Sequence, residues 1–577
     1  MSYTQTPWTW AFLDEFRAKT PSGPKEGITF GGQWPTVPEM FRIISGKFPD
    51  SACFTVFDPE RVSLNYKESL QIIQAVARWL CKSGIQKGDK VAVTGKNSPE
   101  WAIAYLSILF AGATVVPIDY QLKNEETDLL IKTSKAKILF VDEEKHAHYN
   151  QNPGKLQAIV SLRKGVGNYI YTLDGPEAEI PEAVESDIAA ILFTSGTTGI
   201  PKGVMLTHQN LVADCYVAQG NLTVLHSDVF YALLPIHHAY CMLAVFIEAI
   251  STGAEVVFGK KMITSIMLKE LKEGKVTMLL GVPMLFNKLL AGILRGMKAK
   301  GRLVYGILYF LMLVSGLMKK TFGVNPGKKL FGAVLDKASL ATIRICICGG
   351  GPLAPSVFRK FNQLGIDFVQ GYGLTETSPI IALNPVEHYK ETSVGRVLPQ
   401  MEMKILDPDE HGIGEVIVKG PMVMKGYFEM PDETASVFTP DGFFKTGDLG
   451  YMDNENYLYL TGRAGNMIVT EGGKNVYPEE IENEFQLYDE IDQILIRGFY
   501  LDQKMKIESI EALVYPTPEL KNNEGRLLSP EEIKTRINSI VTAVNQRLQP
   551  YQKINRTIIL DQSMEMTTTK KIKRHTV

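Results

Sequence analysis

Helix-like segments alternate with short apolar runs in the first part of the chain, from about Pro35 to Asp142. The helical pattern covers residues 66–84 and 99–113, and the apolar runs are 90–95, 114–118 and 136–142. Strands that are apolar on both faces are typical of parallel sheets, because crossover helices cover both sides. The pattern therefore predicts layered α/β structure.

The alternation returns in the middle of the chain, and the pattern then changes twice. The later apolar runs are 254–259, 276–283, 343–350 and 367–373. They end in Gly-rich stretches, where α/β proteins bind ligands. After about Gly412, short strands with turn signals predict a small β-rich subdomain, and after Arg463 a mixed pattern predicts a small α+β domain. We expect a large N-terminal domain over residues 1–464 and a small C-terminal domain over residues 465–577.

Residues 303–318 form an apolar segment that needs separate treatment. Basic residues flank it on both sides: Lys298, Lys300, Arg302, Lys319 and Lys320. The segment is shorter than the roughly 20 residues that span a bilayer, so a transmembrane helix is the least favoured interpretation. Two alternatives stay open: a helix buried in or docked on the protein, and a helix that dips into a membrane face with its basic flanks on anionic lipid.

Composition and charge exclude several classes of protein. The 577 residues carry a formal net charge of −2, which gives no global electrostatic signal for nucleic acid. The six cysteines are scattered without a CxxC pair, and the histidines show no HExxH motif, so neither a disulfide framework nor a structural metal is indicated. The N-terminus lacks a basic region followed by an apolar core. We therefore expect a reduced, cytoplasmic protein without a signal peptide.

A loop rich in Ser, Thr and Gly follows the apolar run at 189–193, in the sequence "FTSGTTGIPKG". Glycines let backbone N–H groups approach an anion, and hydroxyls add donors, so phosphate is a natural ligand. The P-loop pattern fails here, because Pro201 stands five residues after Gly196 and Gly203 follows Lys202. Composition alone leaves an ordinary surface turn as the alternative.

The full string "FTSGTTGIPKGVMLTHQN" resembles the signature of the AMP-forming acyl-adenylate synthetases, the superfamily of acyl-CoA synthetases, luciferases and adenylation domains. The resemblance recurs in order along the chain, at residues 348–355, 370–379, 444–453, 460–469, 471–482 and 568–575. It covers all but about the first 30 residues. It implies a two-step reaction, in which a carboxylate attacks the α-phosphate of ATP and a thiol then displaces AMP.

The resemblance implies a phosphate-binding loop and a metal ligand. The loop that wraps the β- and γ-phosphates comprises Thr194, Ser195, Gly196, Thr197, Thr198 and Gly199. Lys202 would reach the departing pyrophosphate, and Thr375 would donate to the α-phosphate. Glu376 would bind Mg²⁺ as a hard oxygen ligand, with Thr194 beside it. Without the resemblance, this stretch is a strand end with an exposed glutamate.

Nucleoside contacts are implied by further motifs. Tyr372 would lie against the adenine, and Asp448 would accept from both ribose hydroxyls. Arg463 would contact ribose and phosphate near the domain junction. Gly349, Gly350 and Gly351 have no side chains ahead of Pro352, so a purine or an acyl chain can lie on their backbone. Gly371 and Gly373, beside the tyrosine, are further cofactor-binding candidates.

The basic end "TTTKKIKRHTV" would ordinarily be a solvated tail, but the resemblance puts Lys571 at the catalytic position that bridges carboxylate and α-phosphate. Lys570 stands where the family usually has glycine. The C-terminal domain would rotate between the two steps, with Gly465 at the hinge. After rotation, the loop of Gly472, Gly473 and Lys474 would help to form the tunnel for the thiol.

The substrate is suggested by resemblance to long-chain fatty acyl-CoA synthetases, through the apolar segment 303–318 and the stretch 233–258. His237 and His238 are interpreted as core or pocket-gate residues. We expect a fatty acid, ATP, Mg²⁺ and CoA as ligands, with peripheral contact to the cytoplasmic membrane face as a further hypothesis. Two alternatives remain: an acyl-acyl carrier protein synthetase or fatty-acyl-AMP ligase, and a lipid-binding protein without turnover.

Overall fold

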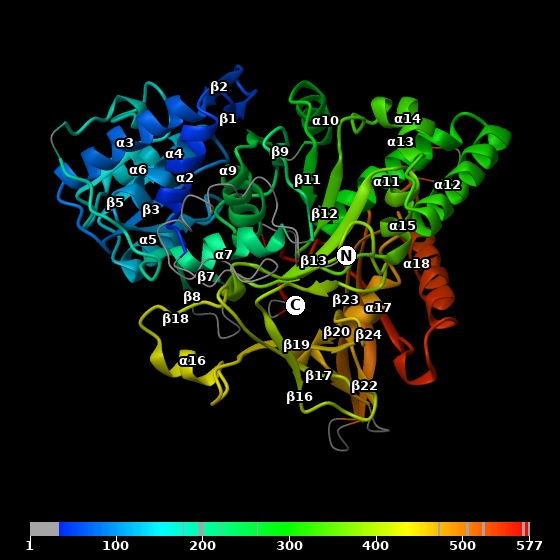
Figure 1. Cartoon of the computed structure of the whole chain (residues 1–577). Coiled ribbons are helices and arrows are strands. Elements are labelled where there is room, and N and C mark those ends of the chain that lie inside the picture. Colours follow the sequence, from blue (N-terminus) through cyan, green and yellow to red (C-terminus); the bar gives the residue numbers. More distant parts are fainter. Residues whose placement is uncertain are drawn as a thin grey trace.

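Two large mixed sheets organise the protein (Figure 1). The computed structural model describes residues 34–176, 178–194, 201–219, 221–261, 263–470, 474–502, 507–521, 525–567 and 572–574. Within these ranges, helices and parallel strands alternate as the hydrophobic pattern predicts. The expected α/β fold class is confirmed.

The first sheet has seven strands in the order β18-β8-β7-β4-β3-β5-β6. They are β3 (Lys90–Thr94), β4 (Thr114–Ile118), β5 (Ile138–Val141), β6 (Ala158–Ser161), β7 (Ile188–Thr194), β8 (Lys202–Thr207) and β18 (Gly426–Tyr427). Neighbours from β6 to β7 are parallel, whereas β8 and β18 are antiparallel additions. The three apolar runs predicted before residue 142 are β3, β4 and β5, and their side chains are almost wholly buried.

The second sheet has thirteen strands in the order β16-β17-β19-β20-β15-β14-β13-β12-β11-β9-β10-β1-β2. They are β1 (Ala52–Val56), β2 (Val62–Asn65), β9 (Val229–Ala232), β10 (Glu255–Phe258), β11 (Met278–Gly281), β12 (Ile345–Cys348), β13 (Asp367–Gly373), β14 (Ile380–Leu383), β15 (Gly395–Val397), β16 (Glu402–Leu406), β17 (Gly414–Lys419), β19 (Phe444–Met452) and β20 (Tyr457–Arg463). The run from β1 to β13 is parallel. The β-rich region after Gly412 extends the same sheet with antiparallel strands.

Helices cover both sheets, and local sequence explains where several begin. The longer elements are α2 (Val37–Lys47), α3 (Tyr66–Lys82), α4 (Pro99–Phe110), α5 (Asn124–Ser134), α6 (Glu143–Gln151), α7 (His208–Ala218), α10 (Thr264–Glu273), α11 (Pro283–Lys298), α12 (Arg302–Phe322) and α15 (Pro355–Gln363). The shorter ones are η2 (Ile170–Thr172), α8 (Ala239–Cys241), η3 (Met242–Ile247), α9 (Glu248–Thr252), α13 (Gly327–Leu330), α14 (Gly332–Lys337), η4 (Thr375–Thr377), α16 (Pro431–Ser436) and η5 (Ala464–Asn466). Asn65 and Glu68 form a capping box that starts α3. The apolar α4 is buried along its whole length, as a helix without a polar face must be.

The C-terminal segment has its own small core. Its elements are β21 (Ile468–Val469), β22 (Asn475–Val476), α17 (Pro478–Asn483), β23 (Ile491–Asp502), β24 (Ile507–Pro516), α18 (Pro530–Asn545), η6 (Pro550–Gln552) and β25 (Arg556–Ile559). A three-stranded sheet of β23, β24 and β25 packs with α17 and α18 through residues such as Ile481, Ile496 and Val541. A domain boundary at residues 464 and 465 stays a prediction.

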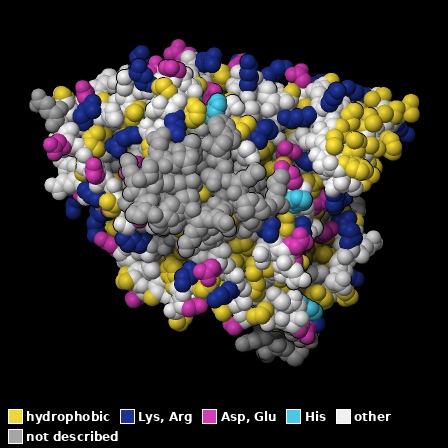
Figure 2. Space-filling view, in the orientation of Figure 1, with side chains coloured by type: hydrophobic (Ala, Val, Ile, Leu, Met, Phe, Trp, Pro, Cys, Tyr) yellow, Lys and Arg dark blue, Asp and Glu magenta, His cyan; other side chains and the backbone are white. Residues whose placement is uncertain are grey.

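The apolar segment predicted at 303–318 belongs to a longer helix, α12, of 21 residues. The helix continues through Lys319 and Lys320 until Gly323, whose left-handed backbone (φ 66°) ends it. Within α12, only Met312 and Ser315 are buried, against neighbouring helices that include α11 and α15. By length and mean hydropathy (1.5) α12 could cross a membrane, and its outer side forms the large apolar patch at the upper right of Figure 2.

One basic flank of α12 differs from the expectation. Lys319 is not solvated: its ammonium donates to Asn362 Oδ1 and Asp367 Oδ1, both at 2.6 Å, and its side chain is only 8% exposed. These bonds tie the C-terminal end of α12 to α15 and β13. The exposed basic residues around the helix are Arg295, Lys298, Lys300, Arg302, Lys320 and Lys329.

Candidate active site

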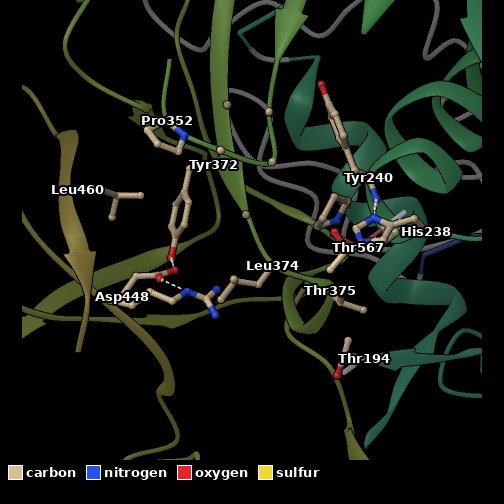
Figure 3. A pocket seen from close by; sticks show the side chains of 18 of the residues that line it. Thr194, His238, Tyr240, Pro352, Tyr372, Leu374, Thr375, Asp448, Leu460 and Thr567 are labelled. Carbon is tan, nitrogen blue, oxygen red and sulfur yellow. Dashed lines mark hydrogen bonds and ion pairs between the residues drawn. The ribbon is translucent and has the colours of Figure 1, made fainter. Parts of the chain in front are cut away.

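A cleft of about 2590 Å³ lies where strands of the two sheets end and the C-terminal segment meets them (Figure 3). Most described residues that the sequence nominated line it: Thr194, Lys202, Gly349, Gly350, Gly351, Pro352, Gly371, Tyr372, Gly373, Thr375, Glu376, Asp448 and Arg463. They come from β7, β8, β13, η4, β19, β20 and the loop after β12. Motifs separated by up to 270 residues in sequence therefore meet at one place.

Some nominated residues are not assembled there. Ser195 to Gly199, Gly472, Gly473 and Lys571 lie outside the described residues. Lys474 is exposed and does not line the cleft. Lys202 faces Thr194 across the antiparallel pair β7 and β8, so these two residues mark the ends of the Ser/Thr/Gly loop.

Tyr372, Asp448 and Arg463 form one connected group. The Tyr372 hydroxyl donates to Asp448 Oδ2 at 2.6 Å, and Arg463 Nε donates to Asp448 Oδ1 at 2.9 Å. Asp448 and Arg463 are opposite residues in the register of β19 and β20, which explains how they meet. Burial, and then the Asp448 charge, raise the pKa of Tyr372 well above its usual range, so the phenol keeps its proton. Each carboxylate oxygen retains a further lone pair for an incoming hydroxyl.

Tyr427, which the sequence analysis did not identify, contacts both Glu376 and Lys202. The Tyr427 hydroxyl donates to Glu376 Oε1 at 3.0 Å, and Lys202 Nζ lies 5.1 Å from the centre of the Tyr427 ring. A cation over an aromatic face is attracted by the ring quadrupole. Strand β18 delivers Tyr427, although it comes more than 220 residues after Lys202. Nothing in the pattern around "KGYF" signals this role.

The Gly-rich loop after β12 is in contact with Tyr240 of α8. A Cβ at Gly349 would come within 3.0 Å of the Tyr240 ring, and Gly350 has a left-handed φ of 78°. The Tyr240 hydroxyl donates to the Ile347 carbonyl at 3.0 Å. One side of the bare backbone is therefore covered by an aromatic ring, which the expectation of an open surface did not include.

His237 and His238 both line the cleft. Burial lowers the pKa of His237 to about 3, so its imidazole is neutral at pH 7. His238 caps the start of α8, where its Nδ1 accepts from the Tyr240 backbone N–H at 3.5 Å. Both positions agree with core or gate residues.

The C-terminal tail reaches the cleft through Thr567 and residues 572–574. The Arg574 guanidinium donates to both carboxylate oxygens of Glu482, at 2.7 and 2.6 Å, and to the Ile496 carbonyl at 2.9 Å. Burial raises the pKa of Glu482 to about 7, although Arg574 opposes that shift. A β-bridge joins Met566 and Ile572, and both residues line the cleft.

Gln486 makes a second connection that the sequence did not reveal. Its amide Nε2 donates to the Pro352 carbonyl, and its Oε1 accepts from the Ala354 N–H, both at 2.9 Å. The same Nε2 also donates to Asn483 Oδ1 at 2.7 Å. One side chain of the C-terminal segment therefore holds the Gly-rich loop at two points.

Comparison with known proteins identifies this arrangement. A family model described as AMP-binding enzyme matches residues 41–428. The chain is 28% identical over 557 residues to a long-chain-fatty-acid–CoA ligase of Bacillus subtilis (strain 168), which covers 89% of each protein. It is also 28% identical to a feruloyl-CoA synthase of Amycolatopsis sp, over 76% of this chain and 80% of the relative. The crystal structure of ATP-bound MatB from Rhodopseudomonas palustris superposes with a TM-score of 0.72 at 25% identity, covering 94% of this chain and 98% of MatB. The chain belongs to the AMP-binding enzyme family.

Proposed function

We propose that this enzyme activates a medium- to long-chain fatty acid with ATP, releases pyrophosphate, and transfers the acyl group from the adenylate to CoA. The relatives are named as a CoA ligase and a CoA synthase, the family as AMP-binding, and the similar structure of MatB contains ATP. The observation that carries the proposal is the convergence of Lys202, Glu376 and the Asp448–Arg463 pair in one cleft. Such charges suit a reaction that brings anions together.

In this proposal different charged groups bind the ribose and the phosphates of the nucleotide. Asp448, already oriented by Tyr372 and Arg463, accepts from the ribose hydroxyls. Lys202 and Arg463 neutralise phosphate charge, and Thr375 donates to the α-phosphate. Lys571 bridges the carboxylate and the α-phosphate, and it precedes Ile572, which lines the cleft. Because the attacking group is already a carboxylate, no general base is needed.

Glu376 suits Mg²⁺ as one carboxylate ligand, oriented by the Tyr427 hydroxyl, with Thr194 nearby in the proposal. Mg²⁺ is usually held by one or two carboxylates together with substrate phosphates. Among the described residues, no three His, Cys, Asp or Glu side chains gather to form an all-protein metal site. Bound Mg²⁺ supplies charge neutralisation at the phosphates.

The acyl group is proposed to lie along the apolar inner part of the cleft. That part is lined by Ala218, Leu222, Phe230, Ala244 and Leu280, among others. Each buried methylene contributes about 0.8 kcal/mol, which favours longer chains as far as the space extends. The similarity to a long-chain ligase supports a fatty acid, whereas the feruloyl-CoA synthase is equally similar in identity and leaves an aromatic acid as the alternative outcome.

The deciding experiment measures pyrophosphate release and AMP release from ATP with fatty acids from C6 to C20 and with ferulate, each with and without CoA. We expect CoA-dependent turnover that peaks at medium or long chains, and loss of that turnover in Lys571→Ala. If the adenylate forms but its acyl group is not transferred to CoA, the proposed acceptor becomes an acyl carrier protein. Absence of pyrophosphate release with every acid would contradict it and favour a lipid-binding protein.

The proposal includes two domains that meet near Gly465 and change their relative arrangement between the half-reactions. The described tail segments lie at the cleft, which is the arrangement adenylation requires. Thioester formation requires the tail to withdraw and the loop that contains Lys474 to approach. In the present arrangement Lys474 is exposed and away from the cleft, which agrees with this order of events.

Peripheral attachment to the cytoplasmic face of the membrane, through α12, completes the proposal. Its outer side, called here the apolar face of α12, consists of Leu303, Ile307, Phe310, Leu313, Leu317 and Phe322. Leu303 is 80% and Phe322 76% exposed, and exposed basic side chains surround the face. An apolar helix with a basic rim is suited to lie in the interface of an anionic bilayer. Because α12 packs on α15 through Met312 and Ser315, it lies on the membrane and does not span it.

Vesicle sedimentation tests this attachment. We expect salt-sensitive binding to vesicles of anionic lipid and weaker binding to neutral vesicles. Phe310→Asp combined with Leu317→Asp should abolish binding, while Val184→Asp, an exposed apolar position elsewhere, should not. Unchanged binding of the α12 variant would contradict the proposal, and so would a concentration-dependent dimer without vesicle binding.

A further inference from the structure

A buried carboxyl group lies at the inner end of the cleft. Glu248, at the start of α9, lines the cleft and is only 5% exposed. Within the described part of the chain, neither of its oxygens has a hydrogen-bond partner of normal geometry. The Cys215 thiol and the Gln219 side chain approach it without compensating for burial. A buried polar group is normally paired, so an unpaired carboxyl in a cavity points to a missing partner.

The helix that carries Glu248 explains its position. Tyr240, Ala244 and Glu248 all line the cleft, at intervals of four residues. The stretch between them, η3, is a π-helix with wider turns than an α-helix, which keeps such intervals on one face. Tyr240 contacts Gly349, at the reacting end of the cleft. Eight residues, or about two turns of helix, separate Glu248 from Tyr240.

The surroundings of Glu248 are otherwise apolar on the cleft side. Ala218, Leu222, Phe230 and Leu280 are buried and line the same cleft. The other titratable groups nearby are the thiol of Cys215 and the carboxyl of Asp214, whose Oδ2 accepts from the Ile380 N–H at 3.5 Å. Burial raises the pKa of Glu248 to about 8, so at pH 7 the group is mostly a neutral acid that both donates and accepts.

We propose that the acyl group bound here carries a hydroxyl in its distal part, which pairs with Glu248. The inference rests on the proposed activation of a fatty acid and narrows it to a hydroxylated chain. The Glu248 O–H donates to the hydroxyl oxygen, and the carboxyl C=O accepts the hydroxyl proton. An unsubstituted chain of the same length offers Glu248 no polar group and leaves it only Cys215 and Gln219 nearby, and sites built to pair a hydroxyl discriminate strongly against analogues that lack it.

The test compares kcat/KM for pyrophosphate release between plain acids and acids of equal length hydroxylated at each position from C8 to the terminus. For the wild-type enzyme we expect at least one hydroxylated acid to exceed its plain counterpart tenfold, which corresponds to about 1.4 kcal/mol. Glu248→Leu should remove that preference and improve the plain acid, while Glu248→Gln should retain part of it. The control is Glu270→Gln, a buried carboxyl bonded to Tyr231 and outside the cleft.

The outcomes separate this inference from the proposed function. Pyrophosphate release with plain acids but no wild-type preference for any hydroxylated acid overturns the inference and leaves the function intact. An unchanged preference in folded Glu248→Leu overturns it as well. Absence of release with every acid contradicts the proposed function itself. If Glu248→Leu does not fold, the wild-type ratio and Glu248→Gln still decide the question.

Discussion

Replacing Gln486 by alanine is the sharpest test of how the C-terminal segment is held at the cleft. The variant removes two hydrogen bonds that cross from this segment to the Gly-rich loop, at Pro352 and Ala354. A hydrogen bond contributes about 0.5–1.5 kcal/mol net, so the two together favour this arrangement by about 1–3 kcal/mol. That range corresponds to a population shift of roughly 5- to 150-fold.

Because the tail lies at the cleft in this arrangement, the loss should affect adenylation. We expect Gln486→Ala to reduce ATP–pyrophosphate exchange by a factor of up to that size, with little or no loss in the transfer of a pre-formed acyl-adenylate to CoA. Asn483→Ala is the matched control, since it removes only the local bond between Asn483 and Gln486. An equal loss in both half-reactions, or the same effect from Asn483→Ala, would refute the reasoning.

Three further predictions follow from single residues. Tyr427→Phe removes the hydroxyl that orients Glu376 but keeps the ring, so we expect the Mg²⁺ concentration for half-maximal exchange to rise several-fold; an unchanged Mg²⁺ dependence would count against the contact. At Gly465 an added Cβ meets no atom within 4 Å in this arrangement, so Gly465→Pro should retain ATP–pyrophosphate exchange. Because proline fixes φ, we expect the same variant to lose thioester formation, and equal losses in both half-reactions would exclude a hinge at this residue. Burial places the pKa of Glu248 above that of an unfolded glutamate, so the folded state binds the proton more tightly and the free energy of unfolding should fall as pH rises from about 4.5 to 8. Asp214 acts in the same direction, and denaturant titrations of Glu248→Gln should show a weaker pH dependence; an identical slope would refute this assignment.

Hydrophobic periodicity predicted most of the layered core, because buried parallel strands and their helices have distinctive patterns. The runs at 114–118 and 367–373 are β4 and β13 with the same bounds. The motif residues of the cleft could also be predicted, because each belongs to a stretch of sequence that resembles a motif of the acyl-adenylate synthetases.

Contacts between residues that only the tertiary fold brings together could not be predicted in this way. Tyr427 reaches Glu376 only because β18 joins the edge of the first sheet, and Gln486 reaches Pro352 only because α17 packs beside the loop. The apolar segment was ended at Lys319 because that residue is charged, whereas in the fold the helix continues through it, with Asp367 neutralising its charge and Asn362 accepting a second hydrogen bond. The sequence shows that a lysine is present, but it does not show whether an acidic side chain from a distant segment will pair with it.

The hydrogen bonds of Arg574 join the C-terminal tail to α17, so the two move together. Glu482, which holds the guanidinium, belongs to α17, and the Ile496 carbonyl belongs to β23 of the same small core. Any rotation that carries α17 away from the cleft must carry residues 572–574 with it. Under the proposed rotation between half-reactions, the tail and α17 would leave the cleft together, and this linkage alone would keep adenylation and thioester formation from occurring in the same arrangement.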